Sequence, residues 1–252
     1  MEIGWIRYLV FCIFIAPPFL RRGVRVLRTA HPWLQAIRSL GLAGATLCFI
    51  LATRFLPIAE ATATHYVCPL LITALSIPVL GETVGWRRWT ATAVGLIGVL
   101  VVMRPLGATF QAAALLPLLS ASFSAVAMVL TRKLAYRDSA ATMLAWSAII
   151  GFLAATAFLP FGFVVPNALE LTIGVGIGLV TSAAQWLVVL AYRNADASLL
   201  APFSYCQIIF SALLGYAIFG NAPDGWSYAG AALIIGSGLY TARRNRVVAN
   251  AD

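Results

Sequence analysis

The feature that most constrains this chain is a series of long apolar runs separated by short breaks that contain charged residues, Gly and Pro. A helix that crosses the hydrocarbon core of a bilayer needs about 20 mostly apolar residues. The sequence therefore predicts an all-α polytopic membrane protein with about nine transmembrane helices. The apolar runs lie at approximately 3–20, 37–55, 58–80, 89–103, 111–131, 140–160, 171–192, 198–219 and 226–241.

The composition excludes a soluble globular enzyme and a disordered chain. Only 10% of the 252 residues are charged and 62% are hydrophobic, whereas an ordinary soluble domain is about 25% charged and about 45–50% apolar. A folded soluble protein needs more polar surface than 17 basic and 8 acidic residues supply. The lipid bilayer is therefore an expected partner of the chain.

The net charge of +9 follows the predicted topology and does not indicate a nucleic-acid partner. Lys and Arg stay on the cytoplasmic side of short loops, and alternate loops differ sharply in their content of these residues. One set of loops contains only Arg54 and Arg104. The sequence thus predicts a multi-pass protein of the inner membrane with a cytoplasmic C-terminus. The bases of the other set are Arg21, Arg22, Arg25, Arg28, Arg38, Arg87, Arg88, Arg132, Lys133, Arg137, Arg193, Arg243, Arg244 and Arg246.

The chain also matches itself when it is shifted by 139 residues. The shift aligns Tyr66 with Tyr205 and Gly81 with Gly220. Since it spans five apolar runs, an odd number, the second copy must have the opposite topology, and the charge bias of its loops is reversed as well. Inverted repeats of this kind occur in secondary transporters, where they place the substrate site at the repeat interface near the bilayer midplane.

This repeat predicts the domain organisation. We expect a first repeat at residues 1–107, a second repeat at 108–246 and a cytoplasmic tail at 247–252. The run at 111–131 has no counterpart in the first repeat, because the counterpart would lie about 30 residues before Met1. The first helix of the first repeat is therefore expected to be missing, through truncation, an internal start codon or divergence.

Two stretches at equivalent places in the repeats carry a family resemblance. They are LPIAEA at 56–61 with CPL at 68–70, LGE at 80–82 and MRP at 103–105, and ASLLAPFSY at 197–205 with FG at 219–220. Both resemble the EamA-type domain of the drug/metabolite transporter superfamily, and the segment around Arg7 resembles its second helix. The resemblance implies ten helices in two inverted five-helix halves, a central cavity and alternating access for small metabolites. The sequence departs from the pattern in having Asn221 where the first repeat has Glu82.

Polar side chains inside the apolar runs are the candidate substrate-binding residues, because such groups are costly in lipid and often functional. His65 could bind substrate or titrate, or it could be a neutral histidine bonded to a neighbouring helix. Arg7 could bind a substrate carboxylate with its planar guanidinium, or extend to the membrane interface. Tyr66 and Tyr205 could offer aromatic faces to a ligand, or simply pack within the bundle. The full set is Arg7, Thr46, His65, Tyr66, Gln185, Trp186, Ser204 and Tyr205.

Two prolines and several glycines have structural interpretations. Pro69 and Pro202 fall inside predicted spans and are expected to kink their helices, either as passive kinks or as hinges. Gly95 and Gly98 permit close helix approach, and they leave a homodimer open as a further partner.

These features predict a secondary transporter for a small organic metabolite. An amino acid or a similar carboxylate or zwitterion is favoured, because Arg7 and His65 could balance an anion. A non-transporting remnant or assembly subunit is the alternative. An intramembrane enzyme is less expected, because the two histidines and eight acidic residues form no metal or nucleophile motif. We therefore predict no catalytic residue, no metal site and no cofactor.

Overall fold

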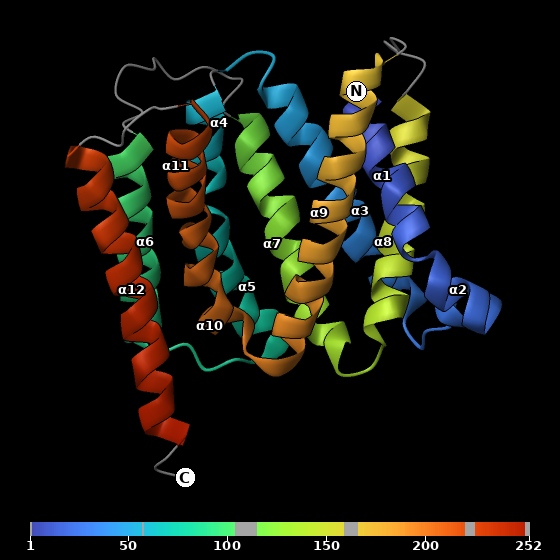
Figure 1. Ribbon diagram of the computed structural model, residues 1–252. Coiled ribbons are helices and arrows are strands. Elements are labelled where there is room, and N and C mark those ends of the chain that lie inside the picture. The colour runs from blue at the N-terminus through green and yellow to red at the C-terminus, as the bar shows by residue number, and fades with distance from the viewer. Residues whose placement is uncertain (1, 57, 104–114, 159–165, 220–224, 250–252) are drawn as a thin grey trace. The chain divides into compact units, whose positions relative to one another are not determined.

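The computed structural model describes residues 2–56, 58–103, 115–158, 166–219 and 225–249, and all regular elements within them are helical (Figure 1). This confirms the predicted helical class. The elements are α1 (Glu2–Phe14), α2 (Ala16–Arg22), the 3-10 helix η1 (Gly23–Leu27), α3 (Pro32–Ala52), α4 (Ile58–His65), α5 (Cys68–Leu80), α6 (Trp86–Met103), α7 (Leu115–Ala135), α8 (Ala140–Phe158), α9 (Ala168–Asn194), α10 (Ala197–Leu200), the 3-10 helix η4 (Ala201–Tyr205), α11 (Cys206–Phe219) and α12 (Gly225–Ala249).

Several of these helices are long and apolar enough to cross a membrane. Within the described residues, five candidate spans meet both criteria, at Pro32–Ala52, Ala61–Leu80, Leu115–Ala135, Ala140–Ala157 and Ala168–Asn194. Three shorter apolar helices accompany them, at Gly4–Phe14, Ala197–Phe210 and Tyr228–Ser237. The chain is thus a multi-pass membrane protein, whereas the count of about nine spans stays a prediction.

Two of the predicted spans are each divided by a change in helical structure. The run at 58–80 contains α4 and α5, and Pro69 lies in the first turn of α5. The run at 198–219 contains α10, η4 and α11, and Pro202 lies in the first turn of η4. A first turn tolerates proline because its backbone N–H groups have no partner within the helix. The starts of α4 and α10, at residues 58 and 197, differ by the same 139 residues as the sequence repeat.

The chain divides into two compact units. Unit 1 contains residues 1–44 and 126–195, and unit 2 contains residues 45–125 and 196–252. In unit 1, α1 packs against α8 and α9. Its core includes Tyr8, Phe11, Leu144 and Val189. Gly178 of α9 permits this approach, because a Cβ atom there would lie 2.6 Å from the Cβ atom of Val10.

In unit 2, α6 runs beside α12 (Figure 1). Gly98 lies at this contact, where a Cβ atom would come within 2.9 Å of the Gly230 carbonyl oxygen. Gly95 faces Tyr205 in the same unit. Both glycines therefore serve packing inside unit 2, and the homodimer stays a prediction.

Candidate functional site

His65 ends α4 at the first helix break and is held by two neighbours in unit 2. Its Nδ1 atom lies 3.2 Å from the Ser120 hydroxyl oxygen on α7. Its ring lies edge-on against Phe49 of α3, with ring centroids 5.5 Å apart. The Ser120 hydroxyl donates to the Ala45 carbonyl oxygen at 2.7 Å. Because a hydroxyl has one proton to donate, we infer that Nδ1 donates to Ser120, which leaves Nε2 of a neutral ring as an acceptor.

The second part of the candidate site is an aromatic pair. The ring centroids of Tyr66 and Tyr205 are 6.0 Å apart, so the two helix breaks lie side by side in unit 2. The Tyr205 side chain is fully buried, and among the described residues its hydroxyl has no hydrogen-bond partner. A buried polar atom of this kind costs about 1–3 kcal/mol if it stays unpaired. The neighbouring Ser204 is exposed.

The other predicted residues lie elsewhere. In unit 1, the Arg7 guanidinium carbon lies 4.8 Å from the centroid of the Tyr8 ring. Gln185 of α9 has a buried side-chain nitrogen without a hydrogen-bond partner among the described residues. Trp186 packs against the core of unit 1. Thr46 is half-buried on α3 in unit 2. Their role in substrate binding stays a prediction.

A buried charged network in unit 1 has no signal in the sequence. Arg38 is not a loop base as the sequence predicts, because it lies inside α3 and is fully buried. Its side chain donates to the Gln35 side-chain oxygen at 3.1 Å and to the Ser147 hydroxyl at 2.8 Å, and it also contacts the Met143 carbonyl oxygen. Gln35 in turn donates to the Asp138 carboxylate at 2.7 Å. Gln35 thus links Arg38 to its counter-charge.

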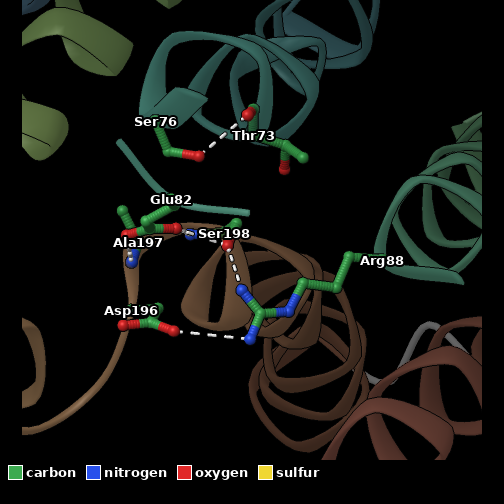
Figure 2. A network of polar contacts seen from close by, with 7 residues as sticks. All are labelled: Thr73, Ser76, Glu82, Arg88, Asp196, Ala197 and Ser198. Atoms are coloured by element: carbon green, nitrogen blue, oxygen red, sulfur yellow. Dashed lines mark hydrogen bonds and ion pairs between the residues drawn. The ribbon is translucent and has the colours of Figure 1, made fainter. Parts of the chain in front are cut away.

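A second network joins the α5–α6 loop to the start of α10 in unit 2 (Figure 2). The Glu82 carboxylate accepts hydrogen bonds from the backbone N–H groups of Ala197 at 2.8 Å and Ser198 at 3.1 Å, and from the Ser198 hydroxyl. Arg88 donates to the same hydroxyl at 2.6 Å and pairs with Asp196 at 3.3 Å. Glu82 therefore supplies the cap that the Asp196 side chain does not provide.

The position of Glu82 follows from the end of α5. Gly81 ends that helix in the left-handed region, with φ 71°, which favours glycine. The backbone N–H of Glu82 then donates to the Ser76 carbonyl oxygen at 3.3 Å. The Gly-Glu pair is visible in the sequence, but its partners at 196–198 are more than 100 residues away, and no local pattern indicates them.

Comparison with known proteins gives the family. The chain matches the EamA-like transporter family over residues 1–104 and 111–242. It is 33% identical to a riboflavin transporter of Rhizobium johnstonii, over 92% of this chain and 78% of the relative. It is 27% identical to an S-adenosylmethionine uptake transporter of Rickettsia prowazekii, over 95% of this chain and 81% of the relative.

The fold is also shared with a solved protein. A crystal structure matches with a TM-score of 0.83 at 26% sequence identity, over 96% of this chain and 88% of that one. The family match and the 33% identical relative together cover nearly the whole chain. This chain therefore belongs to the EamA-like transporter family, whose members are transporters of the drug/metabolite transporter superfamily.

Proposed function

We propose that this chain is a secondary transporter that moves a small organic metabolite across the inner membrane by alternating access, with its C-terminus in the cytoplasm. Membership of the EamA-like family supports this function. The sequence also contains no G-x-x-x-x-G-K-[ST] motif for binding ATP phosphates. We therefore assign the driving force to the gradient of the substrate or of a coupled ion.

The observation that carries the proposal is the pairing of two helix breaks in unit 2. The first break has His65 and Tyr66, the second has Ser204 and Tyr205, and the tyrosine rings lie 6.0 Å apart. At both points the backbone remains in the right-handed helical region, at Val67 in the first and at Leu200 and Cys206 in the second, while the α-helical pattern is interrupted by a turn or a 3-10 segment. In secondary transporters, the substrate site lies where the two repeats meet near the bilayer midplane, and irregular helical segments are common there.

The contacts around His65 favour a substrate with a planar ring. Phe49 and His65 present aromatic surface, and the inferred Nε2 acceptor could bind an N–H or O–H group of such a ring. Two relatives are named as transporters of riboflavin and S-adenosylmethionine, and both compounds contain heteroaromatic rings. The carboxylate or zwitterion predicted from Arg7 and His65 remains compatible, as S-adenosylmethionine also carries an amino-acid group.

Uptake into liposomes tests this proposal. The purified chain would be reconstituted without ATP and supplied in turn with radiolabelled riboflavin, S-adenosylmethionine and a neutral amino acid. We expect saturable uptake of at least one of the two ring-bearing compounds. An excess of the same compound without label should abolish this uptake, and protein-free liposomes should show none. Saturable uptake of the amino acid alone would contradict the ring preference. No uptake of any compound would contradict transport of this substrate class.

A further inference from the structure

We propose that Glu82 and Arg88 are positioning residues of the transport cycle, and that with Asp196 and Ser198 they form a clamp that keeps one end of unit 2 closed. This inference rests on the proposed alternating access. The clamp holds α10 and η4, the short segment that ends at Tyr205. Its release would free that segment to move.

The clamp has the geometry of a specific contact. Two backbone donors and one hydroxyl converge on the Glu82 carboxylate, while the Arg88 guanidinium contacts both Ser198 and Asp196 (Figure 2). Ala197 and Ser198 are fully buried. Hydrogen bonds to ionised groups are stronger than neutral ones. The segment is therefore fixed at its first turn by charge-assisted bonds from outside its own helix.

The sequence repeat shows that the clamp has no equivalent in the other copy. The 139-residue shift gives the position that corresponds to each clamp residue. The counterparts of Glu82, Arg88, Asp196 and Ser198 are Asn221, Ser227, Pro57 and Ala59. None of these is charged, and Pro57 and Ala59 offer no side-chain hydrogen-bonding group. The same four-residue clamp is therefore not repeated at the start of α4.

This asymmetry has a consequence for the direction in which the transporter opens. Inverted repeats place equivalent positions on opposite sides of the membrane. Arg87, in the first turn of α6, and Arg193, in the last turn of α9, adjoin the clamp residues in the sequence. Both belong to the predicted cytoplasmic set of bases. Of the two positions related by the repeat, the one with charged contacts is thus the cytoplasmic one. We therefore infer that, at rest, unit 2 is closed at its cytoplasmic end.

Cys206 provides a direct reporter, because it begins α11 immediately after η4 and is half-buried. The experiment uses the full chain with Cys12, Cys48 and Cys68 replaced by Ala, in membrane vesicles of each orientation. A membrane-impermeant maleimide then reports access to Cys206 from each side. Loss of a charge-assisted bond shifts a two-state equilibrium by about tenfold. Glu82→Gln is therefore expected to speed cytoplasmic labelling by about that factor.

Arg87→Ala is the matched control, because the Arg87 guanidinium stacks on Trp86 and takes no part in the clamp. Its labelling rate should equal that of the parent chain. The charge swap Arg88→Asp with Asp196→Arg should label more slowly than Arg88→Asp alone. If Glu82→Gln does not fold, Asp196→Asn serves the same test, since it removes the charge of one 3.3 Å contact.

Two results separate this inference from the proposed function. If the folded Glu82 and Asp196 variants label at the parent rate, the clamp does not control access and the inference is wrong. If labelling accelerates while the parent chain transports none of the compounds tested, the clamp stands and the substrate proposal fails. A clamp that only stabilises the fold would lower the melting temperature without changing which side labels.

Discussion

The rings of Tyr66 and Tyr205 lie 6.0 Å apart and are inclined at 47° to each other. The two residues occupy equivalent positions under the 139-residue shift, and each lies at the point where a predicted span is interrupted. Aromatic rings at this separation attract one another. The contact therefore joins the two interrupted segments of unit 2 and places the Tyr205 hydroxyl, which has no partner among the described residues, beside them.

Tyr205→Phe should affect substrate binding without weakening the fold. The substitution removes a buried hydroxyl without a partner, so the free energy of unfolding should stay unchanged or rise by about 1 kcal/mol. If that hydroxyl binds substrate, the KM for uptake should rise. Thermal unfolding in detergent and uptake kinetics measure the two effects. A large fall in melting temperature would show that the hydroxyl has a structural partner.

Gly95→Ala, on α6, should disturb the packing of the Tyr205 ring. The new Cβ atom would lie 2.4 Å from the Tyr205 ring, and overpacking of this kind costs about 1–3 kcal/mol. Gly236→Ala is the matched control, because nothing lies within 4 Å of its Cβ position on α12. The control should be neutral or stabilising, as alanine favours helix. Equal melting temperatures for the two variants would contradict the packing of Tyr205 against α6.

Arg38→Met should destabilise unit 1 strongly. It removes the positive charge while the Asp138 carboxylate remains buried, and such losses cost about 3–5 kcal/mol. Adding Asp138→Asn should recover part of the loss, because the two charges are coupled through Gln35. Arg28→Ala, at an exposed position, should have little effect. With Asp138→Asn alone as the fourth variant, chemical unfolding gives the coupling energy, and strictly additive losses would argue against the network.

His65→Ala should affect transport more than stability. Ser120 keeps its bond to the Ala45 carbonyl oxygen without the imidazole, so the packing of α7 on α3 in unit 2 is retained. Loss of one hydrogen bond to substrate would raise KM by about tenfold. Ser122→Ala removes only a bond to the Leu118 carbonyl oxygen on the same helix, and its KM should match the parent value. An unchanged KM in His65→Ala would remove this residue from the site.

The sequence predicted the helices better than the side-chain contacts. Apolar runs locate helices because every backbone polar group must be satisfied within the membrane. Pro69 and Pro202 also indicated where helical structure changes. Which face of a helix is buried is harder to predict, because lipid is as apolar as a protein core. Arg38 shows this limit, since its position near the start of a span resembled a loop base and its partners lie more than 100 residues away.

The candidate site was predictable in part. The repeat shift paired Tyr66 with Tyr205, and these two rings do meet. The contact of His65 with Ser120 was not predictable, because no periodicity links residues 55 apart in sequence. The same reason hides the contact of Glu82 with Ala197 and Ser198. The contact of Arg7 with the Tyr8 ring was not predictable from the sequence either, because the side chains of adjacent helical residues usually point in different directions.

Substrate counterflow tests the central claim, secondary transport by this chain, most directly. Liposomes that contain the purified protein and no ATP would be loaded with unlabelled riboflavin and diluted into a trace of labelled riboflavin, with S-adenosylmethionine run in parallel. An alternating-access carrier should accumulate the label transiently above equilibrium for at least one compound. The parent chain should show this overshoot, and His65→Ala should show less at the same trace concentration. Absence of any overshoot for both compounds, in liposomes that contain folded protein, would contradict the account.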